Sequence, residues 1–127
     1  MKNCLFGSFV VVGLALIVIA PACAEEKSIT GTYECVGDNG DGTSYKGTLK
    51  IVKFGDVFEL TWTIGETSHT GVGIFENHAL CCSWSTTVDG KTVKGVVVYK
   101  IEKDKMTGRW ASHPTNGKVL TETLTKK

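Results

Sequence analysis

The chain has 127 residues, of which 42% are hydrophobic and 21% charged, and its formal net charge at pH 7 is +1. This balance leaves no basic stripe or arginine cluster to neutralise phosphates, which argues against a nucleic-acid-binding protein. The sequence also lacks a block of like charges that would suggest a role at a membrane surface.

The first 24 residues have the layout of a secretory signal peptide. Lys2 supplies the positive start, an apolar run extends from Cys4 to Ala20, and Ala22-Cys23-Ala24 offers small residues at the cleavage site. We therefore expect residues 1–24 to be a signal peptide and residues 25–127 to be a single domain. The mature protein would be secreted or periplasmic.

Two alternatives to cleavage of the signal peptide remain. The apolar run is close to the length that spans a bilayer, so the signal could be retained as an anchor. Alternatively, Ala20-Pro21-Ala22-Cys23 could act as a lipobox that lipidates Cys23, although Ala20 and Pro21 are unusual there. A membrane association is expected only in these two cases.

After residue 25, short stretches of alternating apolar and polar residues are separated by seven turn signals, from Asp38–Gly42 to Pro114–Gly117. Seven short connections join eight strands into a meander, and a meander of eight can close on itself. We predict an all-β, eight-stranded antiparallel up-and-down barrel of the lipocalin or avidin kind. The expected strands are Ser28–Val36, Thr43–Phe54, Val57–Ile64, Thr67–Phe75, one around Leu80–Ser85, Val93–Ile101, one around Lys105–Ala111 and one around Leu120–Leu124.

The alternation predicts which side chains face the interior. The inward residues would be Gly31, Tyr33, Cys35, Tyr45, Gly47, Leu49, Ile51, Phe58, Leu60, Trp62, Ile64, Leu80, Cys82, Trp84, Val93, Gly95, Val97, Tyr99, Ile101, Met106, Gly108, Trp110, Leu120, Glu122 and Leu124. Lys94 and Lys100 must take the outer face of the sixth strand, which leaves Val96 and Val98 exposed beside them. The fourth strand is ambiguous, because either Val72 with Ile74 or Gly73 with Phe75 could face the core.

Six residues are candidates for a ligand-binding interior: Trp62, Trp84, Trp110, Tyr33, Tyr99 and Glu122. Glu122 stands between two inward leucines and would be partly desolvated, so it requires hydrogen-bond partners. We expect Trp110, Tyr33 or the backbone to supply them. A structural role for Glu122 is favoured over a catalytic one.

No catalytic residue, metal site or cofactor is predicted. His69, His78 and His113 lack the spacing of a metal site and are expected to be isolated. Asp38-Asn39-Gly40-Asp41-Gly42 superficially resembles a calcium loop but lacks the downstream glutamate, so it is interpreted as a hairpin turn. The mature cysteines, Cys35, Cys81 and Cys82, are odd in number and are expected to be buried or free rather than disulfide-bonded.

Gly31-Thr32-Tyr33, Gly37 to Gly47, Leu60 to Gly65, Val96-Val97-Val98-Tyr99 and Gly108-Arg109-Trp110 together resemble a group of small exported bacterial proteins. Members are often labelled fibronectin-binding protein or left uncharacterised. The resemblance implies an eight-stranded barrel and a surface-binding role. Ile29 to Tyr33 is also similar to the opening strand of avidins, and Tyr33-Glu34-Cys35 resembles periplasmic lysozyme inhibitors.

These observations favour a non-enzymatic exported protein that binds an extracellular-matrix or envelope protein through exposed residues such as Val96 and Val98. The alternative is a carrier of a small apolar ligand with a calycin-like lumen, lined by Trp62, Trp84 and Trp110. A protein similar to the periplasmic lysozyme inhibitors is a further alternative. An enzyme acting through Glu122 and a histidine is the least favoured hypothesis.

Overall fold

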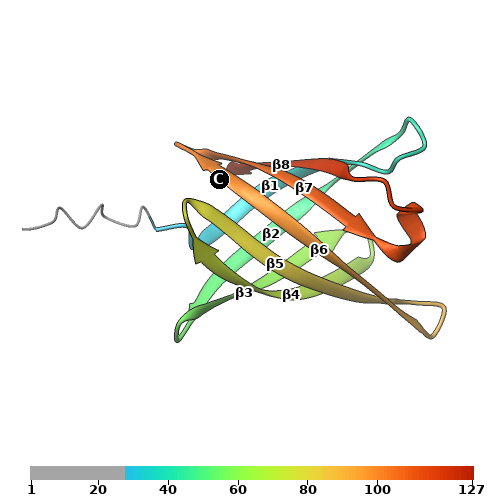
Figure 1. Ribbon diagram of the computed structural model, residues 1–127, viewed down its shortest axis with the longest axis horizontal. Coiled ribbons are helices and arrows are strands. Elements are labelled where there is room, and N and C mark those ends of the chain that lie inside the picture. The colour runs from blue at the N-terminus through green and yellow to red at the C-terminus, as the bar shows by residue number, and fades with distance from the viewer. Residues whose placement is uncertain (1–27) are drawn as a thin grey trace, which may run out of the picture.

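The alternation of apolar and polar residues produces eight strands that pair in chain order (Figure 1). The computed structural model describes residues 28–127; the predicted signal peptide and Cys23 lie outside the described residues. The strands are β1 (Gly31–Asp38), β2 (Ser44–Phe54), β3 (Val57–Ile64), β4 (Thr67–Glu76), β5 (Ala79–Val88), β6 (Lys91–Glu102), β7 (Lys105–Ser112) and β8 (Leu120–Lys126). A short 3-10 helix, η1 (His113–Thr115), interrupts the connection between β7 and β8. None of the helical structure described is long and apolar enough to cross a membrane.

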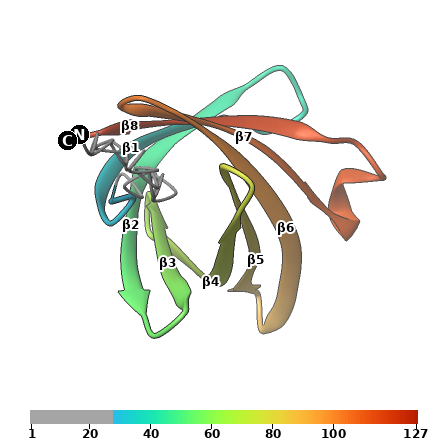
Figure 2. The same ribbon diagram turned by 60° about the vertical axis from the view of Figure 1, so that its left-hand side comes forward.

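Pairing of the first and last strands closes the sheet. Cys35 on β1 lies opposite Leu124 on β8, and Gly37 lies opposite Glu122. Every strand therefore has two antiparallel neighbours, and no edge is left unpaired. Figure 2 shows the strands curving around the interior. The predicted eight-stranded meander barrel is confirmed.

Several connections are as tight as the turn signals predicted. Asn77 and His78 both have positive φ, 52° and 62°, and so do Asp89 and Gly90, 50° and 74°. Two consecutive residues with positive φ give a turn whose twist matches that of the flanking strands. The segment from Asp38 to Thr43 is also a turn, in which the Asp38 carboxylate accepts a hydrogen bond from the Gly40 N–H at 2.7 Å.

The interior side chains follow the predicted alternation, and the largest fully buried ones include Leu49, Ile51, Leu60, Leu80, Tyr99 and Leu124. The ambiguity in β4 is resolved in favour of Gly73, which is buried. Val72 and Ile74 are 47% and 59% exposed. His69 and Gly71 share the inward face of β4 with Gly73, because residues two apart point to the same side.

Inward glycines make room for the large rings of neighbouring strands. Gly108 on β7 is the register partner of Tyr99 on β6. A Cβ atom at Gly108 would lie 2.6 Å from the Tyr99 ring. Gly37 and Tyr45 form a similar pair between β1 and β2. The rings therefore lie across the backbone of the adjacent strand rather than standing into the centre of the barrel.

The outer face of β4, β5 and β6 carries a row of exposed apolar side chains. Ile74 pairs with Cys81, and Cys81 pairs with Val98. Val96 and Val98 are 59% and 45% exposed, as the alternation of β6 predicted. These residues, with Val72, form an apolar stripe on the outside of the barrel.

Candidate functional site

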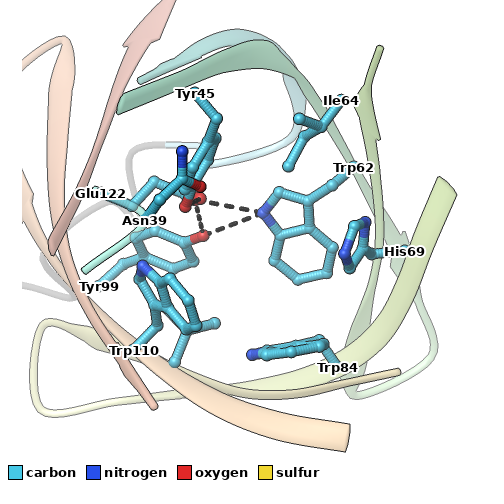
Figure 3. Close-up of a pocket in the computed structure, with 10 residues that line it drawn as sticks. Asn39, Tyr45, Trp62, Ile64, His69, Trp84, Tyr99, Trp110 and Glu122 are labelled. Atoms are coloured by element: carbon cyan, nitrogen blue, oxygen red, sulfur yellow. Dashed lines mark hydrogen bonds between the residues drawn. The ribbon is translucent and has the colours of Figure 1, made fainter. Parts of the chain in front are cut away.

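A cavity of about 190 Å³ lies inside one end of the barrel. This end carries the β1–β2 and β3–β4 connections, since Asn39 in the first loop and Ile64 at the end of β3 line the cavity. Figure 3 shows side chains surrounding an open space between the strands. The lining residues are Asn39, Tyr45, Trp62, Ile64, His69, Trp84, Val97, Tyr99, Trp110 and Glu122.

Each strand from β2 to β7 contributes one aromatic ring to the wall. In chain order these are Tyr45, Trp62, His69, Trp84, Tyr99 and Trp110. Four of the rings form a chain of edge-to-face contacts around the cavity: Tyr45 with Trp110 at 6.4 Å between ring centroids, Trp110 with Trp84 at 6.0 Å, and Trp84 with His69 at 5.6 Å. Edge-to-face contact is a favourable arrangement for aromatic pairs, so the wall is held by its own ring contacts.

The eighth strand contributes the carboxylate of Glu122, which is 4% exposed. Tyr45 Oη donates a hydrogen bond to Oε2 at 2.6 Å, and Trp62 Nε1 donates to Oε1 at 3.2 Å. Tyr99 Oη donates a third hydrogen bond, also to Oε1 (Figure 3). The desolvation of this carboxylate is offset by three donors that come from three different strands.

Burial and the Glu122 charge shift the pKa values of the groups around it. Desolvation, followed by the Glu122 charge, raises the pKa of Tyr45 and of Tyr99 well above the ordinary value for tyrosine. Desolvation lowers the pKa of His69, and the Glu122 charge offsets part of that change. The phenols of the cluster therefore stay protonated as donors at neutral pH, and the His69 imidazole is predominantly uncharged.

Two nitrogen atoms in the wall have no hydrogen-bond partner among the described residues. They are Nδ1 of His69 and Nε1 of Trp110, and both are buried. An indole N–H can only donate, so Trp110 presents a donor that protein atoms leave unused. Buried polar groups are normally satisfied, which makes these two atoms candidates for contact with a ligand or with water.

The structure brings five of the six predicted binding residues together: Trp62, Trp84, Tyr99, Trp110 and Glu122. Tyr33 faces inward but lies elsewhere, near Ile29, Met106 and Lys126. Its hydroxyl donates to the Ile29 carbonyl at 2.7 Å. Tyr33 therefore does not line this cavity. The expected hydrogen-bond partners of Glu122 were wrong, because Tyr45, Trp62 and Tyr99 donate to it rather than Trp110 or Tyr33.

His69 was expected to be isolated but instead lines the cavity. Polar residues, Ser68 and Thr70, flank His69, and Gly71 and Gly73 further along β4 left the alternation ambiguous, so its inward position had no signal in the sequence. Tyr45 was correctly predicted to face inward, but not to contact Glu122. Within residues 28–127, no group of three or more His, Cys, Asp or Glu side chains could hold a metal ion.

The three described cysteines are free, as expected. Cys35 and Cys82 are buried and Cys81 is exposed. Burial, with smaller contributions from the charges of Cys81 and Glu122, raises the pKa of Cys82 to about 12. Burial, followed by the Glu122 charge, also raises the pKa of Cys35, so both buried thiols are protonated packing groups rather than nucleophiles.

The protein is thus an eight-stranded antiparallel β-barrel with an interior cavity. A solved structure of the same fold is apo lipid binding protein 8 of Caenorhabditis elegans, with 15% identity, a TM-score of 0.52 and coverage of 84% of this chain and 100% of that one. A fatty acid transporter, REP1-NXSQ, is similar at 10% identity and a TM-score of 0.48, covering 77% and 95% of the two chains. Human cRBP IV has 16% identity and a TM-score of 0.48, covering 79% and 98%. No protein-family model and no curated protein sequence matches the chain.

Proposed function

We propose that this is an exported, non-enzymatic binding protein that holds a small, largely apolar ligand in the barrel interior. The observation that carries the proposal is the cavity of about 190 Å³ with its aromatic wall. A closed barrel whose interior is filled by side chains would leave no such space. Ligand sites in proteins are typically apolar cavities with a few converging polar groups, and Glu122, Trp110 and His69 are such groups here.

The size of the cavity limits the ligand. An engineered protein cavity of about 150 Å³ binds benzene, whereas drug-sized ligands occupy about 300–1,000 Å³. The interior of this barrel therefore suits a compact molecule of one ring or a short branched chain. A long extended chain would leave most of its length outside the cavity.

The three tryptophans allow a direct test. The chain contains three tryptophans, and all of them line the cavity, so no indole elsewhere contributes background. We expect toluene, as a neutral apolar probe, to shift the three indole N–H resonances in two-dimensional NMR in a saturable manner. The absence of any saturable shift up to the solubility limit of toluene would contradict the proposal.

A matched pair of variants separates occupation of the cavity from general solvent effects. Ile64→Phe enlarges a side chain that lines the cavity, and Thr63→Phe makes a similar change at the neighbouring exposed position on the outer face of β3. We expect Ile64→Phe to weaken toluene binding at least about tenfold because it fills the space. Thr63→Phe should bind as the unmodified protein does.

Recognition of a protein surface is the second candidate, supported by the exposed apolar stripe that includes Val96 and Val98. The resemblance to proteins labelled fibronectin-binding points to immobilised fibronectin as the probe. If this candidate holds, replacing both valines by lysine should abolish binding, whereas Ile64→Phe should leave it unchanged. No binding of the unmodified protein at micromolar concentration would eliminate fibronectin as the partner.

A further inference from the structure

Among the described residues that line the cavity, Glu122 supplies a carboxylate, and no lysine or arginine is present. The three groups that donate to Glu122 are two phenols and an indole, all uncharged. His69, the remaining titratable base in the wall, has its pKa lowered by burial. A buried charge is normally paired, so this site lacks a counter-ion that a ligand could provide.

The aromatic wall also favours a positively charged ligand. The faces of tryptophan and tyrosine rings carry negative electrostatic potential and attract organic cations. In Figure 3, Trp84 is seen edge-on, with one face turned to the space between Trp62 and Trp110. A cation in this space would therefore meet ring faces and the field of Glu122 together. Both contributions are stronger beside low-dielectric protein walls than in bulk water.

The unpaired indole N–H of Trp110 indicates that the ligand also carries a hydrogen-bond acceptor. Its Nε1–H is buried and has no partner among the described residues. A ligand with a hydroxyl or carbonyl oxygen could accept this hydrogen bond. The cation and the acceptor would have to be close together in the ligand, because a cavity of about 190 Å³ encloses only a compact molecule.

We propose that the occupant of the cavity is a small organic cation, an amine or quaternary ammonium compound that also carries a hydrogen-bond-accepting oxygen. This inference rests on the proposed ligand-binding function and specifies the ligand class. The positive group lies against the aromatic faces near Glu122, and the oxygen accepts from Trp110. Fatty acids and other carboxylates are disfavoured, because the cavity offers them no cationic partner and Glu122 repels them.

Three probes of similar shape and different charge test the proposal without any mutation. They are choline, its neutral analogue 3,3-dimethylbutan-1-ol, and the anion 3,3-dimethylbutanoate. We expect choline to bind about tenfold tighter than the alcohol, and the anion to show no saturable binding. The three indole N–H resonances supply the readout, and Trp110 is expected to show the largest shift with choline. Equal or tighter binding of the neutral alcohol would overturn the cation proposal.

Two variants test whether Glu122 and Trp84 cause the preference for choline over the neutral alcohol. Glu122→Gln keeps the size of the side chain and removes its charge, and Trp84→Leu removes a ring that contacts His69 and Trp110 edge-to-face. Each should reduce the ratio of choline to alcohol affinity severalfold while the alcohol still binds. Glu59→Gln is the matched control, since Glu59 is exposed on the outer face of β3, and it should leave the ratio unchanged. Retention of the full ratio in both test variants would overturn the proposed site.

The outcomes distinguish the two proposals. If toluene and the alcohol bind but choline does not, the cation proposal fails and the ligand-binding function stands. If none of the probes binds to the folded protein, both fail. Thermal unfolding of each variant verifies that the barrel is intact, and the comparison of the three probes on the unmodified protein does not depend on any variant.

Discussion

Trp84 on β5 lies directly opposite Gly95 on β6, and its indole ring covers the position that a side chain at residue 95 would occupy. A Cβ atom at Gly95 would overlap both the Trp84 ring and the carbonyl oxygen of Ala111. The backbone oxygen cannot move away without disturbing the pairing of β6 with β7. Gly95 thus determines how Trp84 is placed in the cavity wall.

We expect Gly95→Ala to destabilise the barrel by about 1–3 kcal/mol, the usual cost of overpacking a well-packed interior. Urea unfolding measures this change, and the tryptophan emission spectrum of the folded state should shift because Trp84 is displaced. Lys94→Ala, at the adjacent exposed position, should change the free energy of unfolding by less than about 0.5 kcal/mol. An unchanged stability in Gly95→Ala would contradict the close approach of the ring.

The two buried tyrosine hydroxyls at opposite ends of the interior should differ in their contribution to stability. Tyr99 donates to the Glu122 carboxylate, whereas Tyr33 donates to the Ile29 carbonyl. Hydrogen bonds to a charged group contribute about 1.5–3 kcal/mol and those between neutral groups about 0.5–1.5 kcal/mol. We therefore expect Tyr99→Phe to cost more than Tyr33→Phe in urea unfolding. Combining Tyr99→Phe with Glu122→Gln should be less than additive, and full additivity would contradict the coupling.

Tyrosine ionisation should be suppressed in the folded protein. The chain contains three tyrosines, and the pKa of each is raised: that of Tyr33 by burial, and those of Tyr45 and Tyr99 by burial and the Glu122 charge. The unfolded chain ionises near the ordinary value of about 10, so stability is unaffected below that pH and falls as pH rises above it. Absorbance at 295 nm should stay flat through pH 10 and rise only with alkaline unfolding. A gradual rise centred near pH 10 in the folded state would contradict this prediction.

Acid should destabilise the barrel partly through His69. Burial lowers its pKa in the folded state, so below about pH 6.5 the unfolded chain binds a proton that the folded chain does not. Stability is therefore lost as pH falls from about 6.5 towards the lowered folded-state pKa. We expect the unmodified protein to lose more stability between pH 7 and pH 5 than His69→Phe, which keeps a ring beside Trp84. An NMR titration that gives His69 a pKa at or above 6.5 would contradict this.

The face of each strand could be predicted from the sequence because it depends on alternation alone. Leu120 and Leu124 placed Glu122 in the interior, and Lys94 with Lys100 placed Val96 and Val98 outside, as observed. In β4 the alternation was weak, because glycine can lie on either face. Its register is consistent with packing against β5: Gly71 lies opposite Trp84, and a side chain at residue 71 would overlap a carbonyl oxygen of β5.

The level of a residue along the barrel axis could not be predicted in the same way. This level depends on the tilt and stagger of the strands, which the alternation does not specify. Tyr33 and Tyr45 both face inward, but only Tyr45 lies at the level of Glu122. The same reason explains why the donors to Glu122 were assigned to the wrong residues.

The distribution of the site over the strands links binding to folding of the entire barrel. The rings come from β2 to β7, while Glu122 comes from β8, the strand that closes the sheet against β1. A fragment that lacks β8 lacks Glu122, so the complete site exists only once β1 and β8 have paired. A ligand that binds this site should therefore slow the separation of β1 from β8. It should also raise the melting temperature of the barrel as the ligand concentration increases.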